Sequence, residues 1–140
     1  MSAVSPTAFA RALVAALAPG VKLSLDEPSP EDLAPMVGLN GGPTVWPVFG
    51  QLYMLDGWRD RHEQHPEFDL HFYSRRFLRA EEVALAVENG LVRYPVRVHV
   101  GEKVAVLDRA DVTTATREVP WNVDTGVTRF IGSYQLRTRS

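Results

Sequence analysis

Hydrophobic residues recur every three or four positions in two segments of the chain, which is the spacing of one helix face. In the first segment, Ser5 and Pro6 precede the pattern as N-cap and first-turn residues, and Pro19-Gly20 ends it. The second begins at Arg79 and extends to about Gly90, which suits a helix C-terminus. We therefore expect two amphipathic helices. Their apolar positions are Phe9, Leu13, Ala16 and Leu17, and then Ala80, Val83, Ala84, Val87 and Leu91.

Apolar and polar residues alternate in other segments, which predicts strands with one buried face. The clearest case is Phe68, Leu70 and Phe72, which alternate with polar neighbours. Gly101-Glu102 predicts a tight hairpin connection between two of the strands. The predicted strands are 21–25, 44–55, 67–74, 94–100, 103–107 and 127–137, and 108–118 is a further extended piece.

Two segments lack both patterns and are expected to be loops. Residues 26–43 contain four prolines and three glycines, so regular structure there is local, with Ser29 capping one helical turn. Residues 56–66 are polar and are expected to form a charged hairpin loop. Because Pro47 cannot donate to a sheet ladder, we expect 44–55 to be an edge or interrupted strand.

The order helix, strands, helix, strands predicts a single α+β domain over residues 1–140. A mostly antiparallel sheet buries both amphipathic helices when they pack on one of its faces, as a two-layer sandwich. In the last strand, Gly132 is expected at a bulge or a close contact. A chain of 140 residues can bury about two thirds of the surface that its unfolded form exposes, so a sizeable core is expected.

Composition and charge narrow the function classes. The chain is 45% hydrophobic and 23% charged, which is ordinary for a globular domain. The longest apolar run, 8–18, is too short to span a bilayer, and no basic segment precedes it, so neither a membrane span nor a signal peptide is expected. The absence of cysteine excludes disulfides and thiolate sites. A formal net charge of −2 gives no basic field that would hold nucleic acid.

Candidate chemistry is sparse. His62 and His65 are the one closely spaced histidine pair, but they lie in the predicted charged loop, where a solvated role is favoured over metal binding. The glycine-rich stretch 38–43 is followed by neither a lysine with serine or threonine nor a predicted helix, as a phosphate-binding loop would be. We therefore predict no catalytic residue, no metal site and no cofactor.

Large aromatic and arginine side chains are the candidate contact residues. Trp46 and Trp58 flank the predicted hairpin, and Trp121 follows Pro120 in an irregular segment, where large aromatics often act as contact anchors. An aromatic-rich edge at 44–55 would be unprotected in a monomer, so a partner is expected to cover it. The predicted subunit or partner interface consists of Trp46, Phe49, Tyr53, Trp58, Arg59, Arg61, Arg75, Arg76, Arg79, Trp121 and Arg129.

Four segments in this order resemble the tail terminator proteins of long-tailed phages. They are FDLHFYS at 68–74, LRAEEVALAVENGL at 78–91, VPWNVD at 119–124 and YQLRTR at 134–139. The resemblance implies a small α+β subunit that assembles into a hexameric ring on the head-proximal end of the tail tube. Such a ring ends tube polymerisation and offers a docking face to head completion proteins. Its partners would be copies of itself, the major tail tube protein and a neck protein, with DNA passing through the lumen without specific binding.

Two alternatives stay open. The chain could be another head–tail connector or neck component. It could also be a small-molecule-binding protein or an enzyme whose concave sheet face holds a ligand, lined by His71, Tyr73, His99 and Tyr134. The enzyme alternative lacks a convergent set of polar groups in the sequence.

Overall fold

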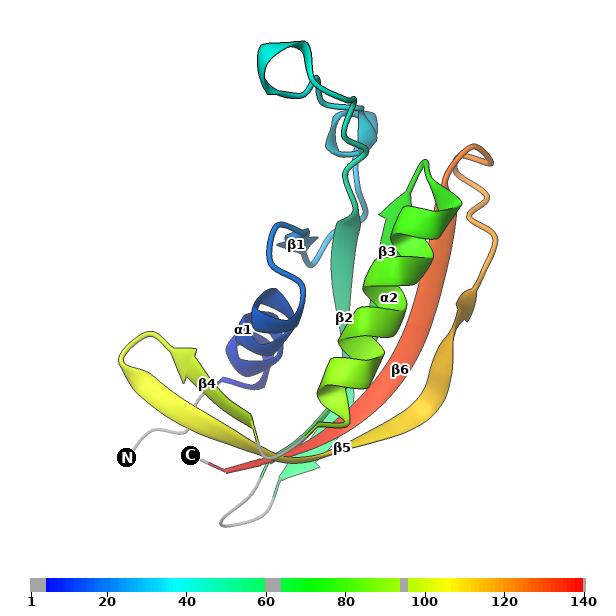
Figure 1. Ribbon diagram of the computed structural model, residues 1–140. Coiled ribbons are helices and arrows are strands. Elements are labelled where there is room, and N and C mark those ends of the chain that lie inside the picture. Colours follow the sequence, from blue (N-terminus) through cyan, green and yellow to red (C-terminus); the bar gives the residue numbers. More distant parts are fainter. Residues whose placement is uncertain (1–4, 60–63, 94–95, 140) are drawn as a thin grey trace.

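The computed structural model describes residues 5–59, 64–93 and 96–139. Helices and strands follow one another in the predicted order (Figure 1). The helices are α1 (Pro6–Leu17) and α2 (Phe77–Leu91), with short 3-10 turns η1 (Pro30–Leu33) and η2 (Leu39–Gly41). The strands are β1 (Lys22–Ser24), β2 (Phe49–Arg59), β3 (Gln64–Ser74), β4 (Val96–Val100), β5 (Lys103–Glu118) and β6 (Thr128–Arg139).

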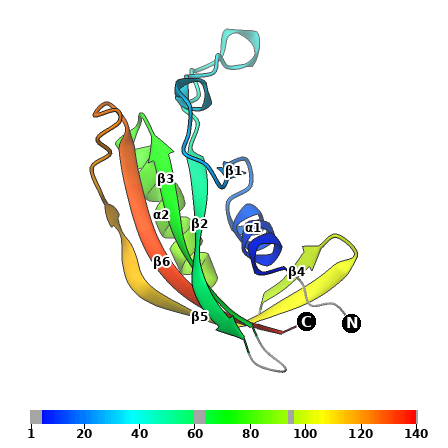
Figure 2. The same ribbon diagram turned by 180° about the vertical axis from the view of Figure 1, so that it is seen from behind.

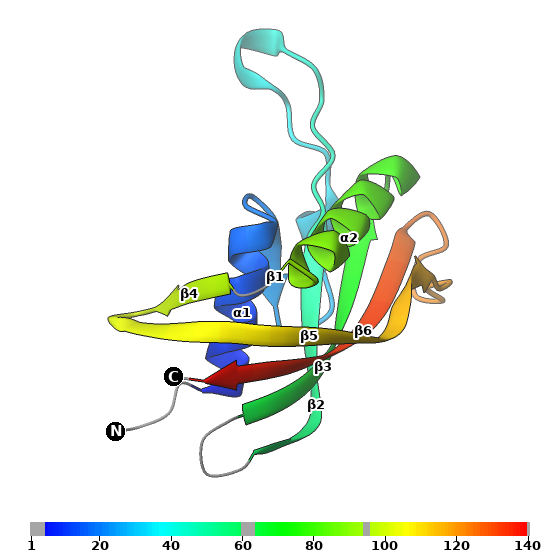
Figure 3. The ribbon, with the colours of Figure 1, turned by 60° about the horizontal axis from the view of Figure 1, so that its bottom comes forward.

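The described strands form one curled sheet in the order β1-β2-β3-β6-β5-β4. All neighbours in the sheet are antiparallel except β1 and β2, which run parallel. The α+β class with a mostly antiparallel sheet is therefore confirmed. Figure 3 shows the long strands β5 and β6 running side by side.

Several strands are longer than the sequence pattern indicated. β2 and β3 pair as far as Arg59 and Gln64, so most of the predicted loop 56–66 is strand, and residues 60–63 lie outside the described residues. The predicted hairpin strand 103–107 and the extended piece 108–118 form the single strand β5. Residues 111–115 in its distal half are exposed, so they show no alternation of apolar and polar residues and the sequence does not predict one continuous strand.

The predicted strand 44–55 requires a correction at its start. β2 begins at Phe49, two residues after Pro47, because proline cannot supply a ladder hydrogen bond. β2 is also not an outermost strand, since the three residues of β1 pair with it from Phe49 to Gln51. Beyond Gln51, no described strand pairs with that edge of β2.

Both helices pack on the same side of the sheet, where the main core lies (Figure 1). Ser5 caps α1 as expected, because its side chain accepts a hydrogen bond from the Ala8 N–H. From the sheet, Phe68, Leu70 and Phe72 of β3 face the helices, which confirms the alternation. The helices contribute Phe9, Leu13 and Val14 from α1, and Ala80, Ala84, Val87 and Leu91 from α2.

A second, smaller core lies on the opposite face of the sheet. It consists of Leu33, Phe49, Tyr73, Trp121 and Val127. Figure 2 shows this face of the sheet, where the segment that contains η1 lies at the upper end of β2. The rest of the far face is not covered by either helix. This small core fixes the segment that precedes the arm described next.

Residues 34–46 leave the body of the molecule as a projecting arm (Figures 1 and 3). The outgoing and returning segments of the arm are joined by two 2.8 Å hydrogen bonds between the backbones of Met36 and Val45. At the tip, Asn40 and Gly41 take positive φ angles of 56° and 74°, which turn the chain back. The proline-rich segment was predicted as a loop with one turn capped by Ser29, and that cap is present at η1.

Candidate contact surface

Polar side chains on the far face of the sheet form a small hydrogen-bonded group. The Tyr73 hydroxyl donates to Gln51 Oε1 at 2.6 Å, and Gln51 Nε2 donates to the Leu25 carbonyl at 3.5 Å. His71 Nδ1 lies 3.4 Å from the same hydroxyl. Burial lowers the pKa of His71 and raises the pKa of Tyr73, and the Arg129 charge lowers the pKa of His71 further. Both shifts favour the neutral side chains, so this group contributes packing and hydrogen bonds.

The alternative ligand site does not form. Tyr73 and His71 lie on the far face of the sheet, whereas Tyr134 belongs to the main core beneath the helices. His99 is exposed on β4, at the other end of the sheet. The four residues share a strand pattern but not a face, because register places Tyr134 opposite Phe68. The prediction that they line one concave surface is wrong.

Glu88 of α2 connects the helix to two strands. Its Oε1 accepts a hydrogen bond from the Tyr134 hydroxyl at 3.0 Å and another from the Thr116 N–H at 2.8 Å. Burial and the neighbouring Glu88 charge raise the pKa of Tyr134 far above its ordinary value. Since both donors already use this carboxylate oxygen, Glu88 acts in the structure as a link between elements.

Metal ligands do not gather within the described ranges: no group of three histidine or acidic side chains there could hold an ion. His62 of the candidate pair lies outside the described residues. Neither described helix is long and apolar enough to cross a bilayer.

A groove of about 300 Å³ lies where α1, α2 and the arm meet. Trp46 is half-buried and contributes to the lining of the groove. The Arg76 guanidinium lies over the Trp46 ring, 4.7 Å from its centre. Arg79 and Glu82 form an ion pair of 3.6 Å among the lining residues. The remaining lining is Leu17, Ala18, Pro19, Gly20, Val21, Met36, Val45, Pro47, Val48, Val83 and Ala86. The groove therefore offers both polar and apolar groups.

The other predicted arginines are engaged within the subunit or not described. Arg75 pairs with Asp124 at 3.0 Å. Arg129 donates to the carbonyls of Val119 and Pro120, at 3.3 and 2.8 Å. These contacts fix the irregular segment between β5 and β6. Side chains of Trp58 and Arg59 in β2 are not described, and Arg61 lies outside the described residues.

The predicted aromatic contact residues separate into buried and exposed groups. Tyr53 is 53% exposed on the far face of β2, 6.3 Å from the His71 ring. Phe49 and Trp121 are only 2% and 6% exposed, in the small core. Trp121 was expected on an exposed segment; instead it packs edge-on against Tyr73, because the Arg129 contacts pull its segment onto the sheet.

Several other exposed apolar side chains lie on the arm and along α2, at positions outside the predicted contact set. On the arm they are Met36, Val37 and Val45, and Val37 is 83% exposed. On α2 and its C-cap they include Leu78, Leu85 and Val92, and Leu78 is 73% exposed. The sequence does carry a signal for the arm, because no charged residue occurs between Asp32 and Asp56 in a chain that is 23% charged.

Comparison with protein-family models finds no match, and comparison with curated proteins finds none either. Among solved structures, the fold matches a chain of a structure described as the virion of a native gene transfer agent (GTA) particle. The match covers 92% of this chain and 86% of that chain, with a TM-score of 0.51 and 16% sequence identity. The chain therefore has a fold that also occurs in a virion component.

Proposed function

We propose that this protein is a structural subunit of a phage-type virion, and that it acts as the tail terminator. In this role, copies of the chain form a hexameric ring on the head-proximal end of the tail tube. The ring ends tube polymerisation and gives the head its docking surface. The observation that carries the proposal is the fold match to a virion chain over 92% of this sequence. The four sequence segments that resemble tail terminators support the finer assignment.

Several features of the surface fit assembly by shape. Exposed apolar side chains occur on the arm and along α2, which are different parts of the subunit. Contacts between two different patches are heterologous, and they close into a ring when the rotation between neighbours fits. Such a ring has two unlike faces. One face would contact the tube, and the other would present no surface for the next tube subunit.

The charge of the chain fits a ring around DNA. A formal net charge of −2 provides no strong basic field that would retard a sliding duplex. We therefore expect DNA to pass through the lumen without specific binding. The chain would be assembled in the host cytoplasm and would end in the neck region of the tail. It would work without a cofactor and without catalysis.

A head–tail connector or another neck protein is the closest rival, because the matched structure is a whole virion. The enzyme alternative has lost its supporting observation, since His71, Tyr73, His99 and Tyr134 do not share a face. The rival roles differ in the surface that the ring binds, either the end of a tube or the head portal.

The test combines the purified chain with polymerising tail tube protein and examines the products by electron microscopy and by mass in solution. A terminator should form rings on one end of each tube and shorten the mean tube length as its concentration rises. Rings that bind portal or neck protein but leave tube length unchanged would favour the connector role. A strict monomer that ignores both would refute the assembly role altogether.

A further inference from the structure

Two apolar surfaces of this chain have no cover within the described structure, and they lie on different sides of the subunit. The first is the outer side of the arm, residues 34–46, where Val37 is 83% exposed; Met36 and Val45 are about half exposed and also line the groove at the root of the arm. The second, here called the α2 stripe, consists of Leu78, Leu85 and Val92. These three positions are seven residues apart, or about two helical turns, so they form one line along the outer side of α2.

The arm of a subunit cannot cover its own α2 stripe. At its root, the arm shares the groove with Arg79, Val83 and Ala86 of α2. At about 100° per residue, the α2 stripe lies roughly 120° around the helix from that side. Figures 1 and 3 show the arm running away from the helices and not across them.

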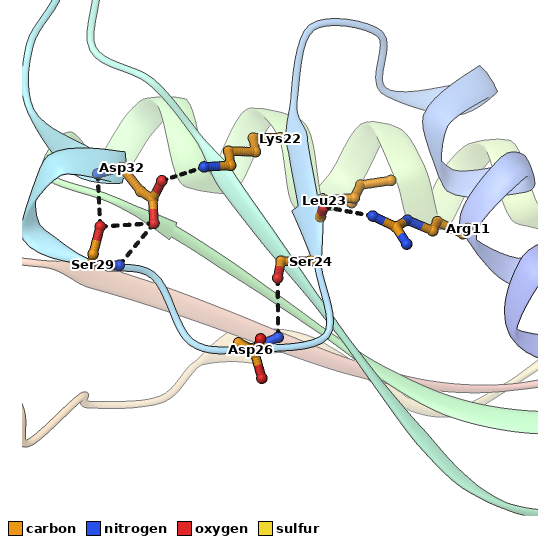
Figure 4. A network of polar contacts seen from close by, with 7 residues as sticks. All are labelled: Arg11, Lys22, Leu23, Ser24, Asp26, Ser29 and Asp32. Atoms are coloured by element: carbon orange, nitrogen blue, oxygen red, sulfur yellow. Dashed lines mark hydrogen bonds and ion pairs between the residues drawn. The ribbon is translucent and has the colours of Figure 1, made fainter.

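The root of the arm is held in this direction by a network of polar contacts (Figure 4). Lys22 of β1 pairs with Asp32 at 2.6 Å, and Asp32 also accepts a 2.8 Å hydrogen bond from the Ser29 N–H. Arg11 of α1 donates to the Leu23 carbonyl at 3.4 Å, which joins β1 to the helix. Because η1 is joined to β1 and β1 is joined to α1, the arm is presented outward in a defined direction.

We propose that the arm of one subunit docks on the α2 stripe of a neighbouring copy, an inference that rests on the proposed ring. The arm is suited to an apolar surface because residues 33–55 include no charged side chain that would lose its hydration on docking. Each subunit then gives its arm to one neighbour and receives the arm of the other. This pairing is heterologous, as ring closure requires.

Charge complementarity orients the docked arm. Glu31 is exposed at the foot of the arm, and Arg93 is exposed just beyond Val92 at the C-terminal end of α2. With the foot at that end, the tip of the arm points along α2 toward Leu78. The α2 stripe spans 14 residue steps, or about 21 Å at 1.5 Å each. From Met36 the arm reaches about 14 Å, with three extended steps of about 3.3 Å and two steps of about 2 Å in η2, so it can cover about two thirds of the stripe.

The absence of cysteine allows a direct test. Val37→Cys and Leu85→Cys proteins are mixed under assembly conditions and oxidised, and the products are separated without reductant. A disulfide-linked heterodimer is expected. As a matched control, Val37→Cys is mixed with Glu102→Cys, which is exposed in the β4–β5 turn and should give only background cross-linking.

A second measurement uses charge in place of thiols. Val37→Asp and Leu85→Asp should each raise the concentration for half-maximal ring formation by about tenfold or more, since a carboxylate would be buried in an apolar contact. Thermal unfolding of the monomer should stay unchanged, because both side chains are exposed. Arg93→Glu should weaken rings, and combining it with Glu31→Lys should restore them.

The outcomes separate this inference from the terminator role. Rings that form normally with Val37→Asp, and give no cross-link between positions 37 and 85, would overturn arm docking and leave the ring intact. If Val37→Asp keeps its rings but no longer caps tubes, the arm binds the tube protein and the inference is equally wrong. A chain that stays monomeric with and without tube protein would overturn both.

Discussion

Replacing Glu88 by alanine should destabilise the subunit by about 2 to 4 kcal/mol. The substitution removes the acceptor of two donors, the Tyr134 hydroxyl at 3.0 Å and the Thr116 N–H at 2.8 Å. A buried donor left without a partner costs about 1 to 3 kcal/mol. Tyr134 is 2% exposed and should lose the full amount, whereas Thr116 is half-buried and can recover part of it from water.

Two matched variants isolate the cause. Both hydrogen bonds end on the same oxygen, Oε1, and the amide oxygen of Glu88→Gln can accept both of them. That variant should therefore lose less than about 1 kcal/mol. Tyr134→Phe removes the donor together with its need for a partner, so it should cost about 1 kcal/mol. In the double variant with Glu88→Ala, the two losses should be less than additive.

Urea unfolding followed by tryptophan fluorescence measures these differences. With a slope of about 1 to 3 kcal/mol per molar urea, the Glu88→Ala midpoint should fall by about 1 M or more. If Glu88→Ala and Glu88→Gln lose the same stability, charge and not hydrogen-bond acceptance is responsible, and the reasoning is refuted. A loss below about 0.5 kcal/mol for Glu88→Ala would also refute it, since ordinary surface substitutions have that size.

The same pair predicts an alkaline effect. Burial, and then the Glu88 charge, raise the pKa of Tyr134 above the ordinary value of 10.0 that applies to the unfolded chain. Its contribution to stability is therefore complete below pH 10 and is lost as the pH rises above it. Tyr134→Phe should lose less stability than the parent chain between about pH 9 and 11, where the parent tyrosine begins to ionise in the unfolded state.

Three further predictions concern other parts of the subunit. Gly132→Ala should cost about 1 to 3 kcal/mol in thermal unfolding, because a Cβ there would lie 2.7 Å from Cζ of Tyr134. The hydrogen bonds from Lys22 and the Ser29 backbone lower the pKa of Asp32 from 3.8 to about 2, so its contribution is present above pH 3.8 and is lost as the pH falls toward 2. Asp32→Asn should therefore flatten the acid dependence of unfolding in that range. Trp46→Ala should impair ring formation in electron micrographs more than it lowers the melting temperature; an equal loss of thermal stability would assign that ring to packing within the subunit.

The sequence predicted the elements whose residues are buried on one face. α1, α2 and β3 show clear periodicity because their apolar residues form the main core. The distal half of β5 does not, because α2 covers little of it and its residues are exposed. Its backbone is held by pairing with β6 across a bulge in which two residues of β5 oppose Gly132. The suggestion of a bulge or close contact at Gly132 is confirmed by this register and by the adjacent Tyr134 ring.

The candidate contact residues were harder to predict, because burial depends on segments distant in sequence. Trp121 is preceded by proline in an irregular segment, and nothing local indicates that Leu33 and Tyr73 will cover it. The arm was read as a loop from its prolines and glycines, which describe backbone conformation and not surface chemistry. Its lack of charge over residues 33–55 is the informative feature, because an exposed segment that avoids charge is suited to a partner.

The fold match at 16% identity has a physical consequence for where partner specificity lies. A core needs apolar residues of suitable volume on the correct face, so β3 or α2 can change nearly every residue and keep the fold. A heterologous contact instead needs two surfaces that fit each other, and the arm and the α2 stripe must change together. If arm docking holds, exchanging the arm alone between this protein and a second protein that assembles in the same way should break both assemblies, whereas exchanging the arm together with the outer side of α2 should preserve them.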